Sequence, residues 1–87
     1  MKYYVITIEQ YTDKDTGKAV ELGKIKKENT YDGALSYFYN CLKTVTDSAA
    51  HNYLDIKIMQ SKEGGILKKD KYGEYVDVDT DATPAEG

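Results

Sequence analysis

The chain has 87 residues, 40% of them apolar, and a formal net charge of −3. This composition predicts one globular domain with a modest core. All 12 basic residues are lysines, which disfavours sequence-specific nucleic-acid binding because arginine supplies the forked donor that reads phosphates and guanine edges. One cysteine and one histidine are too few for an internal disulfide or a structural zinc site.

The chain also shows no membrane or export signal. No apolar run approaches the roughly 20 residues that span a bilayer. The first residues show no signal-peptide pattern. We therefore expect a cytoplasmic protein without a membrane partner.

The first half of the chain predicts a hairpin of two strands. Residues 2–11 alternate with a period of two, so the side chains of Tyr4, Ile6 and Ile8 share one face of a strand. A polar turn follows over residues 12–18, and residues 19–27 form the second strand. The apolar phase changes after Gly23, which predicts a β-bulge there that returns Ile25 to the core side.

The middle of the chain predicts a single helix. Thr30 is a suitable N-cap, and Asp32 lies in the first turn, where the helix dipole favours a carboxylate. The apolar residues that follow recur at helical spacing and form one stripe. They are Tyr31, Ala34, Leu35, Phe38, Cys41, Leu42 and Val45.

The last third predicts a second hairpin. Residues 53–60 alternate, with Leu54, Ile56 and Ile58 on one face, and a glycine-containing turn leads to a strand at 66–69. A fifth short strand over residues 74–78 is an alternative to a chain end without regular structure. Together these elements predict an α+β domain over residues 1–78, in which one helix packs on a four-stranded, mainly antiparallel sheet in the order ββαββ. Residues 79–87 are expected to form a disordered acidic tail.

Several segments together resemble a known group of proteins. They are the opening Met1-Lys2-Tyr3-Tyr4-Val5-Ile6-Thr7, the helix entry Tyr31-Asp32-Gly33-Ala34-Leu35, the hairpin Gly64-Gly65-Ile66-Leu67-Lys68 and the acidic, proline-containing end. In this order they are similar to small orphan proteins of bacteriophages and mobile elements from gut Firmicutes. The resemblance implies expression inside a bacterial host cell. It implies no catalytic residues and no cofactor.

The sheet face away from the helix is the candidate binding surface. We expect the helix to cover Tyr4, Ile6 and Ile8 together with the apolar side of residues 53–60. The opposite face then carries an aromatic and apolar patch rimmed by charge, which is typical of an interaction surface. The alternative is a mixed face that simply contacts water, because tyrosine and threonine favour strands. The expected partner-binding residues are Tyr3, Val5, Tyr11, Tyr53, Asp55, Lys57 and Met59.

No pattern predicts catalysis or metal binding. Cys41 lies on the apolar helix stripe, which favours a small core residue, and His51 falls in a predicted loop. Asp13 and Asp15 resemble the start of a calcium loop, but Lys24 stands where that loop needs a glutamate. Asp77, Asp79 and Asp81 are expected to solubilise the tail rather than to bind metal.

These expectations lead to a function class rather than to a specific activity. We expect a non-enzymatic protein that acts by contact with another protein or with a second copy of itself. Such a protein would inhibit a host system or serve as a self-associating accessory protein. The alternatives are a component of phage particles or their assembly, and a nucleic-acid-binding or DNA-mimicking module.

Overall fold

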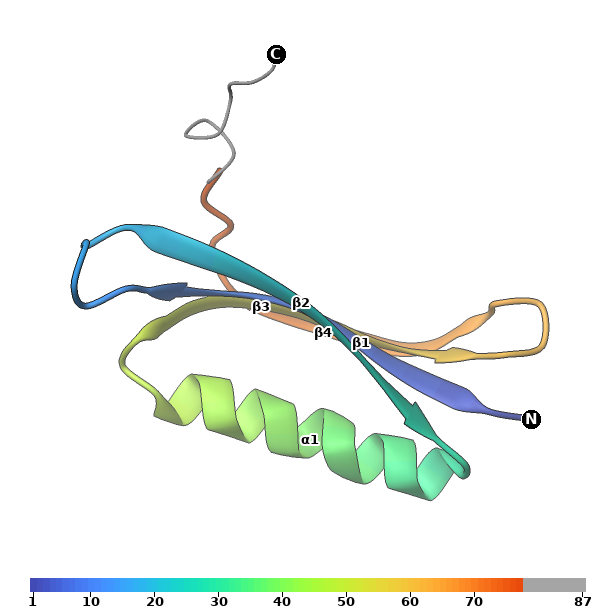
Figure 1. Ribbon diagram of the computed structural model, residues 1–87. Helices are drawn as coiled ribbons and strands as arrows, with labels where there is room; N and C mark the ends of the chain where they lie inside the picture. The colour runs from blue at the N-terminus through green and yellow to red at the C-terminus, as the bar shows by residue number, and fades with distance from the viewer. Residues whose placement is uncertain (78–87) are drawn as a thin grey trace, which may run out of the picture.

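The computed structural model describes residues 1–77 and confirms the predicted ββαββ architecture. The elements are β1 (Tyr3–Thr12), β2 (Ala19–Glu28), α1 (Tyr31–Asp47), β3 (His51–Gln60) and β4 (Ile66–Gly73). The four strands form one antiparallel sheet in the spatial order β2-β1-β3-β4. The helix α1 lies along one face of this sheet (Figure 1). We call this the helix face and the opposite one the open face.

The helix begins and packs as its sequence predicts. The Thr30 hydroxyl accepts a hydrogen bond of 3.0 Å from the Gly33 amide, which satisfies one of the free N–H groups of the first turn. Along the apolar stripe, Ala34, Phe38 and Val45 are buried. They pack with Val5 from β1 and with the apolar side of β3 into one core cluster. The β3 members of that cluster are Leu54, Ile56 and Ile58, each 1% exposed or less.

The predicted orientation of β1 is wrong. Val5 and Thr7, not Ile6 and Ile8, lie under the helix, and Val5 is fully buried. The pairing with β3 is the cause: Val5 lies opposite Ile58, and Thr7 lies opposite Ile56. Because directly paired residues point to the same face, the pattern of β3 decides the orientation of β1.

The predicted bulge at Gly23 is also wrong. The β1–β2 register is continuous, and Gly23 lies opposite Ile8 without a shift. Ile25 therefore pairs with Ile6 and stays on the open face, where it is 69% exposed. Irregularities occur instead between Gln10 and Tyr11 of β1 and between Ile58 and Met59 of β3.

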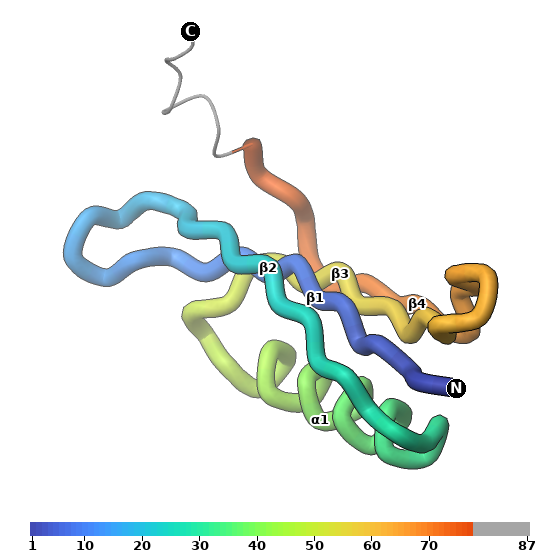
Figure 2. Tube along the Cα trace, turned by 45° about the vertical axis from the view of Figure 1, so that its right-hand side comes forward, coloured from blue at the N-terminus to red at the C-terminus, as the bar shows by residue number. Residues whose placement is uncertain are grey.

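The chain after β4 crosses the open face instead of forming a fifth strand. Residues 74–77 form no strand, and we call them the strap. They rise on the side of the sheet away from α1 (Figures 1 and 2). Gly73, with a φ of 79°, permits this change of direction. Residue 78 and the predicted tail over residues 79–87 lie outside the described residues.

The side chains of Gln10 in β1 and Tyr75 in the strap hold the strap on the sheet. The side-chain amide of Gln10 donates to the Val76 carbonyl oxygen at 2.6 Å, and its oxygen accepts from the Val76 amide at 3.0 Å. The Tyr75 hydroxyl donates to Glu21 at 2.8 Å, and the Tyr75 ring meets the Tyr53 ring edge to face. Gln10 is fully buried as a result, and the strap covers one end of the open face.

Candidate functional site

The open face carries an apolar surface that nothing among residues 1–77 covers apart from the strap at one end. Its strands present side chains in cross-strand rows, so that Tyr4 lies beside Met59 and Ile6 lies beside Ile25. Ile8, Ile25 and Ile66 are exposed at 37%, 69% and 53%. The apolar patch of the open face consists of Tyr4, Ile6, Ile8, Ile25, Met59 and Ile66.

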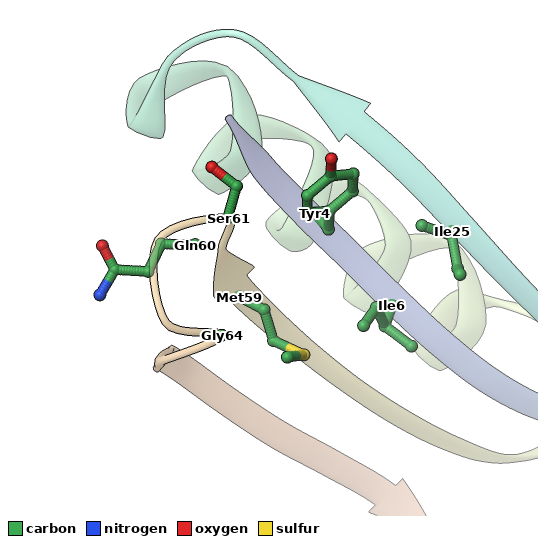
Figure 3. A pocket seen from close by; sticks show the side chains of 7 residues that line it. All are labelled: Tyr4, Ile6, Ile25, Met59, Gln60, Ser61 and Gly64. Atoms are coloured by element: carbon green, nitrogen blue, oxygen red, sulfur yellow. The ribbon is translucent and has the colours of Figure 1, made fainter. Parts of the chain in front are cut away.

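A shallow hollow lies within this patch. Figure 3 looks onto the open face, with α1 behind the sheet, and shows Tyr4, Ile6, Ile25 and Met59 around the hollow. The β3–β4 turn closes one end of it with Ser61 and Gly64. Its volume of about 280 Å³ is below the usual range for a drug-sized ligand. A hollow of this volume has room for a single large side chain.

Lysines gather on the β3–β4 half of the same face. Lys57 of β3 lies directly opposite Lys69 of β4, and Lys71 lies opposite Asp55 one row away. Like charges in direct cross-strand pairs destabilise a sheet. Within residues 1–77, none of these three lysines has a carboxylate within ion-pair distance. We call Lys57, Lys69 and Lys71 the lysine cluster.

Tyr53 marks the border between the open face and the strap. Its side chain points to the open face, but the Tyr75 ring covers it and leaves it only 8% exposed. Burial raises the pKa of its hydroxyl, and the neighbouring carboxylate of Asp55 adds to this effect. Tyr53 therefore supports the strap instead of presenting an aromatic ring to a partner.

The predicted site residues divide between the two faces. Tyr53, Asp55, Lys57 and Met59 all come from β3 and lie on the open face, as expected. The three from β1 do not, because the strand has the opposite orientation. Val5 is in the core, Tyr3 packs against it with its ring 5.8 Å from that of Tyr31, and Tyr11 packs on His51.

Sequence reasoning missed most of the apolar patch. Tyr4, Ile6 and Ile8 were expected in the core, and Ile25 was expected to turn inward at a bulge. A signal was present in the hairpin itself: a regular register places Ile25 beside Ile6 and leaves Lys24 and Lys26 beside Thr7 and Val5. The cross-strand pair Ile6–Ile25 indicates an apolar face of the hairpin. The alternating residues Lys24 and Lys26 belong to the opposite face.

A polar cluster lies on the helix face, at the end away from the helix N-terminus. The Glu9 carboxylate is 3.0 Å from His51 Nε2 and 3.3 Å from Lys24 Nζ. Cys41 and Tyr37 line the same hollow from α1. The structure thus brings Cys41 and His51 to one site, which the sequence gave no reason to expect, and it places His51 in β3 rather than in a loop.

The surroundings of Cys41 in this polar cluster favour its neutral thiol. Burial raises the pKa of the Cys41 thiol, and the Glu9 carboxylate raises it further, so the thiol stays protonated at neutral pH. His51 Nε2 is engaged by Glu9, and its buried Nδ1 has no hydrogen-bond partner among the described residues. Within residues 1–77 no three His, Cys, Asp or Glu side chains are placed to hold a metal ion.

No protein-family model, no curated protein and no solved structure matches this chain. In the part of the chain that the structure describes, no helix is both long enough and apolar enough to cross a membrane.

Proposed function

We propose that this protein acts without catalysis, by binding another protein through the open face of its sheet. The observation that carries the proposal is the apolar patch on the sheet face opposite α1, which no helix within residues 1–77 covers. A small domain leaves such a patch in water at a cost in solubility, and a contiguous patch rimmed by charge is typical of an interaction site.

The partner has an apolar projection and acidic surroundings. The hollow between Tyr4, Ile25 and Met59 accepts one side chain, and the lysine cluster beside it favours carboxylates. Tyr4 and Met59 suit such a contact, since tyrosine offers a large amphipathic surface and methionine adapts its shape.

A second copy of the chain is a weaker candidate for this surface. In one arrangement, two copies meet through their open faces and each strand lies over the same strand of the other copy. The lysine cluster of one copy would then face the lysine cluster of the other. If β2 of one copy lay over β4 of the other, the lysines would be buried against Ile6 and Ile25. Both arrangements desolvate Lys57 and Lys69, which lie opposite each other and have no carboxylate within ion-pair distance among the described residues, and this is costly.

Nucleic-acid binding is likewise less favoured by the geometry. Sheets that bind single-stranded RNA stack bases on exposed aromatic rings. Tyr75 covers Tyr53, so the tyrosine rings that remain accessible at the open face in the described part of the chain are those of Tyr4 and of Tyr75 in the strap. Two rings at opposite ends of the face and a few lysines give a weak platform.

The biological setting is part of the proposal. The resemblance to small phage and mobile-element proteins supports a partner inside a bacterial cell. An inhibitor of a host system acts by occupying a surface of its target. The contact described above supplies that mode of action without a catalytic group.

The test compares binding by two charged variants. Ile25→Lys places a charge in the apolar patch, and Tyr39→Lys places the same charge on the exposed side of α1, where Tyr39 is 52% exposed. Affinity capture from bacterial lysate, followed by titration of the captured protein, should show binding weakened at least about tenfold in Ile25→Lys and unchanged in Tyr39→Lys. Equal binding by both variants would rule out the open face.

A measurement of molar mass by light scattering across a wide concentration range separates the two kinds of partner. A monomer at all concentrations leaves the patch free for a different protein. A dimer that Ile25→Lys dissociates would assign the patch to self-association and overturn the choice made above.

A further inference from the structure

Within residues 1–77 the sheet ends in two free edges, and β2 forms the longer one. In this part of the chain β2 pairs only with β1, and β4 pairs only with β3. The strand β2 has ten residues against eight in β4, and its residues Glu21 to Lys27 are all exposed. The backbone N–H and C=O groups along such an edge can pair with another strand.

The hydrogen bonds of the β1–β2 hairpin show which backbone groups of β2 point outward. The Asp13 amide donates to the Lys18 carbonyl oxygen at 2.9 Å, and hydrogen-bonded pairs alternate with non-bonded pairs from there along the ladder. The even-numbered residues of β2 therefore bond to β1. The odd-numbered residues, among them Glu21, Gly23 and Ile25, present their backbone groups to the outer edge.

The outer edge of β2 is complementary to itself. If a second copy pairs antiparallel about a two-fold axis at Gly23, outward-pointing residues meet each other, and Glu21 lies opposite Ile25 of the second copy. On the helix face, Leu22 lies opposite Lys24. No like charges lie opposite each other in this register, and Gly23 brings no side chain to the axis.

The lysines of β2 do not oppose this pairing. Lys24 Nζ is 3.3 Å from the Glu9 carboxylate, and Lys26 Nζ is 3.1 Å from the Glu28 carboxylate, so both lysines have a counter-charge within their own chain. A register shifted by two residues towards the end of β2 would place Lys24 opposite Lys24, which destabilises a sheet. A shift in the other direction shortens the overlap. The charge pattern therefore selects the register centred on Gly23.

The edge of β4 is unsuited to the same pairing. In the registers with the longest overlap, Lys69 would lie opposite Lys69 or opposite Lys71 of the second copy. A further shift brings Lys68 or Lys71 opposite its own equivalent. Lysines on an edge strand are a common protection against such pairing. Charge complementarity thus assigns a second copy to the edge of β2.

We propose that β2 pairs with β2 of a second copy, so that the two sheets join into one continuous sheet. The contact is small, so the dimer is reversible and depends on concentration. Both helices lie on one side of the joined sheet, and both open faces lie on the other. The dimer therefore presents two apolar patches on one side. The benefit of binding a partner twice rests on the proposed function, whereas the dimer itself does not.

The first experiment measures the dimer by sedimentation equilibrium between about 0.01 and 1 mM. The natural chain should dimerise. Gly23→Pro removes an outward N–H without touching the ladder to β1, and it should stay monomeric. Gly23→Ala is the matched control: it keeps the N–H, its added carbon meets only the Thr7 carbonyl oxygen at 3.9 Å, and it should dimerise. A monomeric natural chain, or a dimer that Gly23→Pro retains, would overturn the proposal.

Two charges at Ile25 test the register independently of the proline variant. Ile25→Lys places a lysine opposite Glu21 of the second copy and should strengthen the dimer. Ile25→Glu places two carboxylates opposite each other and should weaken it at least about threefold. Both substitutions put a charge at the same exposed position, so the fold is affected alike. Equal dissociation constants for the two variants would contradict the pairing.

Amide hydrogen exchange locates the contact and separates the possible failures. Exchange at the outward amides of Glu21 and Ile25 should slow as the protein concentration rises, and exchange along β4 should not change. Slowing along β4 instead, or along β2 only after a captured partner is added, would overturn the self-pairing. Ile25→Lys should keep the dimer and lose the captured partner. If the dimer is absent while Ile25→Lys still abolishes capture, only the inference fails and the proposed function stands.

Discussion

Both faces of the sheet carry apolar side chains, but the two faces are buried to very different extents. On β1, Val5 and Thr7 are almost fully buried under α1, whereas the larger Ile6 and Ile8 remain half-buried or exposed on the open face. Hydrophobicity alone would place Ile6 and Ile8 in the core. The difference is that the helix covers one face, while the strap covers only the end of the other near Gln10.

In a small two-layer domain, the sheet face that the helix covers becomes the core, even where the other face carries larger apolar side chains. Val5 and Thr7 are short, and they leave room for Phe38 to approach the strands beneath α1. Tyr4 and Ile6 would hold the helix further from the sheet. A closely packed core favours this complementary fit over the largest set of apolar residues.

The largest expected effect comes from placing the same charge on each face. Ile56→Asp buries a carboxylate at a fully buried position and should cost about 3–5 kcal/mol, enough to unfold a domain of this size. Ile25→Asp, on the exposed patch, should cost less than about 1 kcal/mol. Urea denaturation followed by circular dichroism measures both. Similar losses in both variants would mean that the open face is buried as well.

A smaller loss of stability is expected from a substitution at Gly73, where the chain leaves β4 and enters the strap. In Gly73→Ala, the new methyl group overlaps the Asn52 carbonyl oxygen and meets a φ of 79°, so we expect a loss of about 2–3 kcal/mol. Gly17→Ala is the matched control, with a φ of 74° and no atom within 4 Å of the added carbon. It should cost about 1 kcal/mol.

Amide hydrogen exchange sharpens this prediction. Release of the strap should speed exchange at Val76 in Gly73→Ala, because its amide loses the Gln10 acceptor. Exchange in α1 should change much less. Loss of protection throughout the sheet would mean instead that Gly73 supports the whole fold.

The next expected effect is a gain in the stability of the protein when Thr7, on the helix face, is replaced by valine. The Thr7 hydroxyl is buried there without a hydrogen-bond partner among the described residues. Thr7→Val keeps the shape and removes this polar atom, so stability should rise by about 0.5–1 kcal/mol. Thermal unfolding measures the change. A loss of stability would indicate that the hydroxyl is hydrogen-bonded, for example to water.

The smallest effect is a dependence on alkaline pH. Burial raises the pKa of Cys41 and Tyr37 on the helix face and of Tyr53 under the strap. Each group favours folding while it is neutral, so its contribution is complete below the pKa in the unfolded chain, about 8.5 for cysteine and 10 for tyrosine. The contribution is lost as the pH rises through the higher pKa of the folded state.

Melting temperatures between pH 7 and 10.5 test this dependence. The melting temperature should fall towards the alkaline end, and Cys41→Ala should fall less steeply because one titrating group is gone. An identical decline in both proteins would mean that Cys41 does not contribute.

Most of the fold was accessible from local signals. The helix was readable because its cap, Thr30, and its apolar stripe act within one element. The strand β3 was readable because only one of its faces is strongly apolar. β1 was ambiguous because both of its faces are apolar, and a shift by one residue exchanges the faces completely.

The candidate site was predictable only where it rests on such an unambiguous strand. The four predicted residues on β3 lie on the open face, while Tyr3, Val5 and Tyr11 on β1 do not. The cover that the strap places over Tyr53 depends on a contact between positions 10 and 76, which no local pattern indicates.

The sequence by itself determined the element order, the helix with its buried stripe, and the inward face of β3, because periodicity and capping act between neighbouring residues. The tertiary structure was needed to decide which face of β1 and β2 lies under the helix and where the strap crosses the sheet. It also decided that three lysines gather beside an apolar patch that residues 1–77 leave largely exposed. These outcomes depend on strand register and on contacts between distant residues, whose free energies appear only when the whole sheet is assembled.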